Sequence, residues 1–309
     1  MRIILFFIDG LGLGSNDTTE NPLVKNMPFL NSLFGDDCFI NNGKIKQGTH
    51  AVLKPIDAQL GVPGLPQSAT GQTALFTGEN AAQILGFHLT ATPNTRLAEL
   101  LKEKSILKQL KNAGFSVTGV NAYSQQYLEK ADEGELPYSA SSFAIMASGE
   151  QFRLMEDLRQ NKAVFMDITN EHLLPFGYEG IKKITPRQAA KNLLAVSAEN
   201  HFCLYEYFLT DYYGHGRGTI KDVIRILKHI DSFTRFTVKG LPPDSILIIT
   251  SDHGNIEKLN HKPHTTHPVP FIVVSSQPDW RKYFIHRVHS IVDVTPAILE
   301  AFQKWGEQK

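Results

Sequence analysis

Three mostly apolar runs in the chain each end close to an acidic residue. The runs and the acidic residues that follow them are 2–8 with Asp9, 202–209 with Asp211, and 245–249 with Asp252. Apolar runs of this length are typical of strands that are buried on both faces of a sheet, as in parallel sheets. We therefore predict that these three runs are core strands.

The rest of the chain alternates between helical and extended patterns. Helices are predicted at 26–34, from 68 onward, and at 94–113, 185–198, 220–239 and 295–305, and further strands at 51–60, 115–120, 163–168 and 269–275. Strands that alternate with helices indicate an α/β fold, with a mostly parallel central sheet and helices on both of its faces. We predict one domain over residues 1–309. The less regular region 123–184 is either a small cap or a peripheral extension of the core.

Composition narrows the function classes. Apolar residues make up 42% of the chain and charged residues 20%, and 31 basic residues balance 31 acidic ones. No global field therefore favours nucleic acid or an anionic membrane surface, and no run approaches the roughly 18 apolar residues of a membrane helix. The two cysteines, Cys38 and Cys203, favour reduced thiols and a cytoplasmic setting, with a disulfide as the alternative. Asp9 ends the first apolar run too early for a signal peptide.

The candidate functional residues lie at the ends of the predicted strands. Asp9, Asp211 and Asp252 each follow a predicted core strand, His253 adjoins the last of them, and His215 comes one helical turn after Asp211. Ligands of open α/β sheets bind beyond the carboxyl ends of the strands, and carboxylates and imidazoles are common metal ligands. A single aspartate after a strand is often only a turn former. Its recurrence at three strands favours a site.

A predicted helix begins near Ser68, with Thr70 and Gly71 in its first turn. Backbone N–H groups at a helix N-terminus bind phosphate and favour an ionised nucleophile. On this stretch alone, the simpler interpretation is that Ser68 or Thr70 caps the helix. The glycine-rich loop at 10–14 does not have the spacing of a dinucleotide or P-loop motif.

Taken in order, these segments resemble the alkaline phosphatase superfamily, and most closely its branch with cofactor-independent phosphoglycerate mutase and phosphopentomutase. The matching segments are 9–10, 64–68, 211–216, 252–257, 264–270 and 293–299. Each segment is weak by itself, but their joint order spans nearly the whole chain and is specific. The resemblance implies an alkaline phosphatase-like fold and two divalent metal ions.

The resemblance also implies the ligands of the two ions. One set consists of Asp9, Ser68, Asp252 and His253, and the other of Asp211, His215 and His264. Oxygen and imidazole ligands of this kind suit zinc or manganese. His267 lies in the same motif but outside the ligand position, so we interpret it as a supporting or loop residue.

Two departures separate the chain from the mutases. Ala69 and Gln72 stand where the mutase has a glutamate and a histidine after its serine, and the predicted core elements between Ser68 and Asp211 leave no room for the large phosphotransfer domain. These departures favour a hydrolase of a small organic phosphate mono- or diester. Ser68 would be its nucleophile and carry a phosphoserine intermediate, with Thr70 as the alternative.

Rival functions remain at this stage. A phosphomutase would return the phosphoryl group to an isomeric substrate, and a non-catalytic metal-binding relative would do no chemistry. A sulfatase is disfavoured, because the site lacks the Cys/Ser-x-Pro-x-Arg arrangement. Four basic residues are candidate phosphate contacts but are more typical of surface charges: Arg96, Arg153, Arg217 and Lys262. Neither the substrate nor the oligomeric state follows from the sequence.

Overall fold

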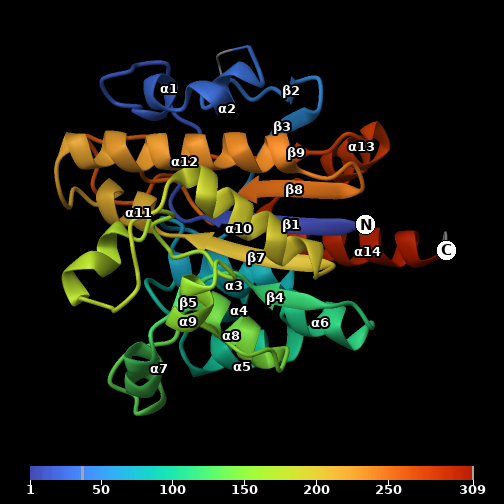
Figure 1. Ribbon diagram of the computed structural model, residues 1–309. Coiled ribbons are helices and arrows are strands. Elements are labelled where there is room, and N and C mark those ends of the chain that lie inside the picture. Colours follow the sequence, from blue (N-terminus) through green and yellow to red (C-terminus); the bar gives the residue numbers. More distant parts are fainter. Residues whose placement is uncertain (36–37, 308–309) are drawn as a thin grey trace.

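A seven-stranded sheet forms the centre of the molecule in the computed structural model, which describes residues 1–35 and 38–307 (Figure 1). The spatial order is β2, β3, β9, β8, β1, β7 and β4. β1 is parallel to β7 and β8, and β4 to β7, whereas β9 is antiparallel to β8 and β3, and β2 to β3. The predicted α/β fold with a central sheet is confirmed, and the sheet is mixed: β4, β7, β1 and β8 are parallel neighbours, whereas the pairings through β9, β3 and β2 are antiparallel. The strand bounds are β1 (Arg2–Ile8), β2 (Lys46–Gln47), β3 (Ala51–Ile56), β4 (Val117–Gly119), β7 (Phe202–Tyr207), β8 (Ser245–Thr250) and β9 (Val269–Val274).

The alternation of side chains along β1 divides the interior into two hydrophobic cores. Ile3, Leu5 and Phe7 lie in one core, and Ile4 and Phe6 lie in the other. Successive strand residues point to opposite faces, so a strand that is apolar at every position needs helices on both sides. The apolar run that predicted a core strand therefore also requires the layered arrangement that Figure 1 shows.

Each face of the sheet has its own set of helices (Figure 1). The first face is covered by α3 (Ser68–Thr77), α4 (Ala81–Leu85), α5 (Thr95–Lys104), α6 (Ile106–Asn112), α8 (Ala140–Ala147), α13 (Pro278–Arg287), the short 3-10 helix η2 (Ile291–Asp293) and α14 (Val294–Glu307). The second is covered by α1 (Leu23–Asn26), α2 (Pro28–Ser32), α10 (Pro186–Ala198), α11 (Leu209–Gly214) and α12 (Ile220–Gly240). The long α12 buries a stripe at helical spacing, including Val223, Ile226, Leu227 and Ile230. Such a stripe fixes which side of an amphipathic helix meets the sheet.

A smaller unit lies beside the carboxyl end of β7. Its elements are β5 (Ala122–Tyr123), parallel to β6 (Arg153–Leu154), with α7 (Gln125–Asp132), α9 (Met155–Arg159) and the 3-10 helix η1 (Glu171–Phe176). A third hydrophobic cluster, which includes Met155, Leu158 and Leu173, holds it together. Helix α8 comes from the same part of the chain but packs against α3, α5 and α6. Region 123–184 thus contributes both to this unit and to the main core.

Several predicted elements differ from the observed ones. The helix predicted over 94–113 is two helices, because Ser105 is extended and its hydroxyl donates to the carbonyl of Ala144. The helix over 26–34 is interrupted before Pro28, which disfavours helical backbone at Met27. The strand over 163–168 is reduced to one bridge at Val164. Helices α4, α7 and α13 were not predicted.

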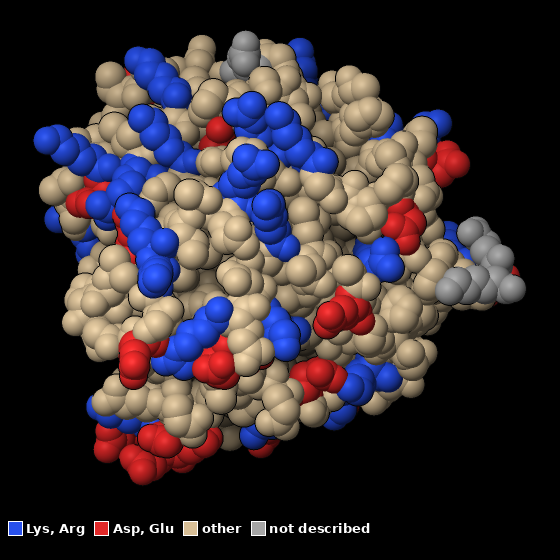
Figure 2. Space-filling model, viewed as in Figure 1, with Lys and Arg blue, Asp and Glu red and all other residues tan. Residues whose placement is uncertain are grey.

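Although the formal net charge is zero, the charged side chains are unevenly distributed over the surface. In Figure 2, lysine and arginine side chains gather over the part of the face crossed by α10 and α12. These helices carry Arg187, Lys191, Lys221, Arg225, Lys228 and Arg235. Acidic side chains gather at the end of the molecule where α7 lies in Figure 1. Within the described chain, no helix combines the length and apolar character needed to cross a bilayer.

One close approach positions α3 against the end of β8. A Cβ atom on Gly71 would lie 2.9 Å from the carbonyl oxygen of Asp252 and 3.1 Å from its Cβ. Only glycine therefore lets the first turn of α3 come this near to Asp252.

We predict that Gly71→Ala lowers the Tm by a few degrees, because overpacking at this contact costs about 1–3 kcal/mol. Gly306→Ala is the matched control, since Gly306 also lies in a helix but its Cβ would meet no atom within 4 Å. The control should leave the Tm unchanged or slightly higher. Thermal unfolding of both variants measures this. Equal Tm values for Gly71→Ala and the wild-type protein would contradict the close approach.

Candidate metal centre

The register of the central strands brings three distant aspartates to one end of the sheet. Ile8 pairs with Tyr207 in β7, and Phe7 pairs with Thr250 in β8. Asp9 therefore emerges beside the end of both neighbours, and its N–H donates to the carbonyl of Tyr207 at 2.9 Å. Asp252 follows β8, and Asp211 lies in the first turn of α11 after β7. The strand-end pattern in the sequence thus corresponds to one location in space.

The first group of candidate ligands surrounds Nε2 of His253. This nitrogen lies 3.3 Å from Oδ1 of Asp9, 3.4 Å from Oδ2 of Asp252 and 3.0 Å from Oγ of Ser68. All four residues are buried. Asp9, Asp252 and His253 form one of the residue groups with the geometry to hold a metal ion.

The second group is centred on Asp211. Its Oδ1 lies 3.2 Å from Nε2 of His264, and its Oδ2 lies 3.3 Å from Nε2 of His215. The two imidazole Nε2 atoms are themselves 3.1 Å apart. The rings of His253 and His264 stack with centroids 3.7 Å apart, so the two groups are contiguous. Asp211, His253 and His264 form a further group that could hold an ion.

All three histidine rings are oriented by backbone carbonyls. Nδ1 of His264 is 2.7 Å from the carbonyl of Pro66, and Nδ1 of His215 is 2.9 Å from that of Lys262. Nδ1 of His253 faces the carbonyl of Gly254 at 3.4 Å. A carbonyl only accepts hydrogen bonds, so Nδ1 carries a proton in each ring, and Nε2 has a lone pair for a metal ion whenever the ring is neutral. Backbone hydrogen bonds of this kind orient the rings of metal-ligating histidines.

The electrostatics of the two groups favour a cation. Burial raises the pKa of Asp9 well above its usual range, and the carboxylates of Asp252, Asp211 and Glu206 raise it further. Burial and the charge of Asp211 raise the pKa of Asp252 to about 7. Burial acts in the same direction on Asp211, but hydrogen bonds from His215 and His264 outweigh it and lower the pKa of Asp211. Buried carboxylates this close together repel one another unless positive charge lies between them.

Unpaired oxygens also fit a metal ion. Oδ1 of Asp9 and Oδ2 of Asp252 are buried and accept no hydrogen bond within the described structure. Buried polar atoms without partners are costly and rare, and metal coordination would satisfy both oxygens. Carboxylate, hydroxyl and imidazole donors are a suitable set for a divalent ion. The residues present therefore fit the group that they would hold.

The hydroxyl of Ser68 faces this centre and does not cap the helix. Gln67 occupies the N-cap position of α3 without a side-chain cap, and Oγ of Ser68 contacts His253. The hydroxyl of Thr70 instead donates to the carbonyl of Gln67 at 3.1 Å. The capping interpretation of Ser68 is therefore wrong, and the geometry distinguishes it from Thr70.

A second ring of residues supports the candidate ligands. Glu257 is buried and accepts hydrogen bonds from the N–H groups of Gly12 at 3.0 Å and Asn255 at 2.7 Å, and its Oε1 lies 3.0 Å from Nδ1 of His267. The structure thus places His267 on Glu257 and outside both candidate ligand groups. The side chain of Asn255 donates to Oδ1 of Asp211 at 2.9 Å.

Some residues that border the site were not recognised in the sequence, and some candidates lie elsewhere. Gln72, noted only as a departure, donates to Oδ2 of Asp9 at 3.1 Å. Glu206, buried in β7, was missed, although a glutamate between two tyrosines in an apolar run was a usable signal. Arg153 bonds the carbonyls of Gly119 and Lys162, and the guanidinium of Arg217 lies over the ring of Tyr212.

Comparison with known proteins identifies the class. The model of the metalloenzyme superfamily matches residues 1–304, so the chain belongs to this superfamily of alkaline phosphatase-like, metal-dependent phosphoryl-transfer enzymes. The resemblance inferred from the ordered motifs is confirmed.

Three individual proteins illustrate how far the similarity extends. The 2,3-bisphosphoglycerate-independent phosphoglycerate mutase of Antithamnion sp. is 31% identical over 106 residues, which is 32% of this chain and 20% of the mutase. The mutase of the same name from Gracilaria tenuistipitata var. liui is 30% identical over 130 residues, or 38% of this chain and 25% of the mutase. The matches thus span a quarter or less of these relatives. The structure of the PH0037 protein from Pyrococcus horikoshii has a TM-score of 0.51 at 14% identity, covers 89% of this chain and 85% of its own, and shares the fold.

The contrast between two histidines tests the ligand groups. We predict that His264→Ala weakens binding of one divalent ion by more than roughly 100-fold, because it removes a ligand nitrogen. His267→Ala should cost roughly 10–100-fold at most, since Glu257 keeps its backbone partners. Titration of metal-free protein with zinc or manganese, followed by calorimetry, measures both. A larger loss for His267→Ala would show that the two histidines have been assigned the wrong way round.

Proposed function

We propose that the protein hydrolyses a small organic phosphate ester, with two divalent ions as cofactors and Ser68 as the nucleophile. The observation that supports this most strongly is the position of Ser68 Oγ, 3.0 Å from Nε2 of His253 at the N-terminus of α3. A hydroxyl at this position meets the positive end of a helix and the donor set of the candidate metal centre together.

The same two groups would hold the ions. Asp9, Ser68, Asp252 and His253 would bind one, and Asp211, His215 and His264 the other, with zinc or manganese as the suitable elements. When bound, two such ions neutralise the charge that develops on the attacking and leaving oxygens of a phosphoryl transfer.

The chain's own residues then account for the covalent steps. Ser68 Oγ loses its proton and forms a bond to phosphorus, while the bond between phosphorus and the ester oxygen breaks and the departing alcohol takes up a proton. Water next attacks the phosphoserine and releases inorganic phosphate, which restores the hydroxyl of Ser68. The N–H groups of the first turn of α3 would stabilise the negative charge of a phosphoryl group placed beside Ser68.

A phosphomutase is the second candidate, and the two mutase relatives favour it. Two features favour hydrolysis instead. Gln72 donates to Asp9 at the position where a mutase has a histidine, and α5, α6, α8, α10 and β4 between Ser68 and Asp211 pack on the central sheet. This segment therefore supplies core elements in place of a large phosphotransfer domain.

We predict that Ser68→Ala reduces turnover of a generic aryl phosphate at least about 1000-fold, because the route through phosphoserine is lost. Thr70→Ala is the matched control: its hydroxyl bonds the backbone of Gln67, so turnover should change by no more than a few-fold. Steady-state kinetics with metal-loaded protein measure both. An active Ser68→Ala variant, or a phosphopeptide that maps to Thr70, would refute the assignment of the nucleophile.

The fate of the phosphoryl group separates the two candidate functions. If the protein is a hydrolase, the reaction in ¹⁸O-labelled water should place the label in free phosphate, because water attacks the phosphoserine. An isomeric phosphate ester without label would identify a mutase. Mass spectrometry of the products distinguishes the two results.

A further inference from the structure

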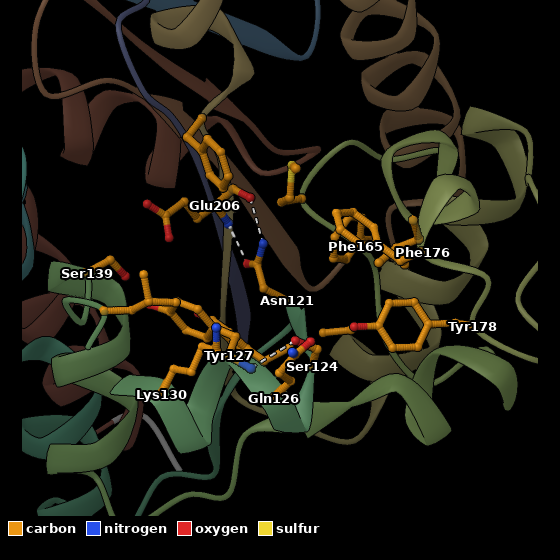
Figure 3. A pocket seen from close by; sticks show the side chains of 16 residues that line it. Asn121, Ser124, Gln126, Tyr127, Lys130, Ser139, Phe165, Phe176, Tyr178 and Glu206 are labelled. Atoms are coloured by element: carbon orange, nitrogen blue, oxygen red, sulfur yellow. Dashed lines mark hydrogen bonds between the residues drawn. The ribbon is translucent and has the colours of Figure 1, made fainter. Parts of the chain in front are cut away.

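A cavity of about 620 Å³ lies between β7 and the small unit built from β5, α7 and η1. Its volume falls in the range of about 300–1,000 Å³ that is typical of small-molecule sites. Figure 3 shows Phe165, Phe176 and Tyr178 toward one side of this cavity, and Tyr127 with Ser139 and Lys130 toward the other.

The cavity and the candidate metal centre both border the end of β7. Glu206 and Phe208, at the end of β7, line the cavity. Phe208 is the N-cap residue of α11, whose first turn carries Asp211. A molecule with its phosphate at the metal centre can therefore extend its other end into the cavity.

Aromatic side chains dominate the wall. Six of them contribute: Tyr123, Tyr127, Phe165, Phe176, Tyr178 and Phe208. Phe176 is 74% exposed and Phe208 is 39% exposed, although large apolar side chains favour burial. Rings arranged in this way offer faces and edges to another ring, with which they pack favourably.

Three polar groups of the wall are hydrogen-bonded within the protein. The amide of Asn121 donates to the carbonyl of Glu206 and accepts from its N–H, both at 2.8 Å. The hydroxyl of Tyr127 donates to the carbonyl of Pro137 at 3.0 Å, and Oγ of Ser124 accepts from the N–H of Tyr127 at 3.1 Å. A ligand rich in hydroxyl groups would lose hydrogen bonds to water and gain few here.

The described cavity wall has one acidic residue, Glu206, and one basic residue, Lys130. The buried carboxyl group of Glu206 accepts a hydrogen bond from the hydroxyl of Ser141, where α8 meets β7. A phosphate beside Glu206 would be repelled by the ionised carboxyl group, whereas an uncharged group would not be. Lys130, the basic residue of the lining, is partly exposed and lies 4.0 Å from the carboxylate of Glu135, which offsets its charge. The charged end of the substrate therefore belongs at the metal centre and the uncharged end in the cavity.

We propose that the cavity binds the organic part of the substrate and that this part is an uncharged aromatic group, an inference that rests on the proposed function. The substrates are then phosphate esters of alcohols that carry an aromatic ring, and short polyol phosphates are poor substrates.

The comparison of 2-phenylethyl phosphate with ethyl phosphate tests the proposal. Both release a primary alkanol, so leaving-group chemistry contributes little to the difference. The aromatic ester should have a kcat/KM at least roughly 10-fold higher, because its ring fills an apolar pocket. Equal kcat/KM values for the two esters would overturn the proposal.

Variants of the wall assign the preference to this cavity. Phe176→Ala and Tyr127→Ala should each lower kcat/KM for the aromatic ester several-fold and leave that for ethyl phosphate within about twofold, since only the ring contacts the wall. Tyr127→Phe should retain the preference. Phe87→Ala is the matched control, because Phe87 is 50% exposed and does not line the cavity. A selective loss in Phe87→Ala, or none in the wall variants, would count against the assignment.

Binding of 2-naphthol to metal-free protein, followed by its fluorescence, provides a readout without turnover. Saturable binding that is weakened by Phe176→Ala but not by Phe87→Ala would support the ligand class even if neither ester is hydrolysed, in which case only the proposed hydrolase activity fails. Hydrolysis of both esters at equal rates without naphthol binding would overturn the cavity proposal and leave the hydrolase activity standing.

Discussion

The concentration of buried carboxylates at one end of the sheet is the constraint on which the rest of the structure depends. Asp9, Asp211 and Asp252 converge because β1, β7 and β8 are parallel and in register. Their mutual repulsion and the loss of hydration are costly, and two divalent ions would offset both. Three contacts hold the candidate ligand atoms in place around these carboxylates. They are the close approach of α3 at Gly71, the contact between the carbonyl of Pro66 and His264, and the hydrogen bonds to Glu257.

In the proposed function, chemistry and substrate recognition come from different parts of the chain. The seven candidate ligands lie before residue 69 or after residue 210, on or beside the central sheet. The cavity wall comes mostly from residues 121–178, with Glu206 and Phe208 as the link. A rigid sheet end can therefore keep one type of phosphoryl transfer while the inserted unit changes the organic group that is accepted.

Much of the sheet and the convergence of Asp9, Asp211 and Asp252 could be predicted from local patterns, whereas the resemblance to the superfamily supplied Ser68 and His264 as candidate ligands. An apolar run followed by an acidic residue indicates a core strand and the location of its end, as at Asp9 and Asp252. Tertiary contacts accounted for the errors: the break at Ser105 depends on a hydrogen bond to Ala144, and the orientation of His264 depends on a carbonyl far away in the sequence. Glu206 and the cavity were missed because the residues that line it share no periodicity.

The number of metal ions that the protein binds tests the central claim most directly. Metal-free protein should take up two zinc or manganese ions per chain, and binding should weaken below about pH 6, because a protonated imidazole cannot act as a ligand. Elemental analysis after incubation and removal of free metal gives the number. Two ions per wild-type chain, with fewer in His264→Ala, is the predicted result. No more than trace metal after incubation with either element would contradict the account.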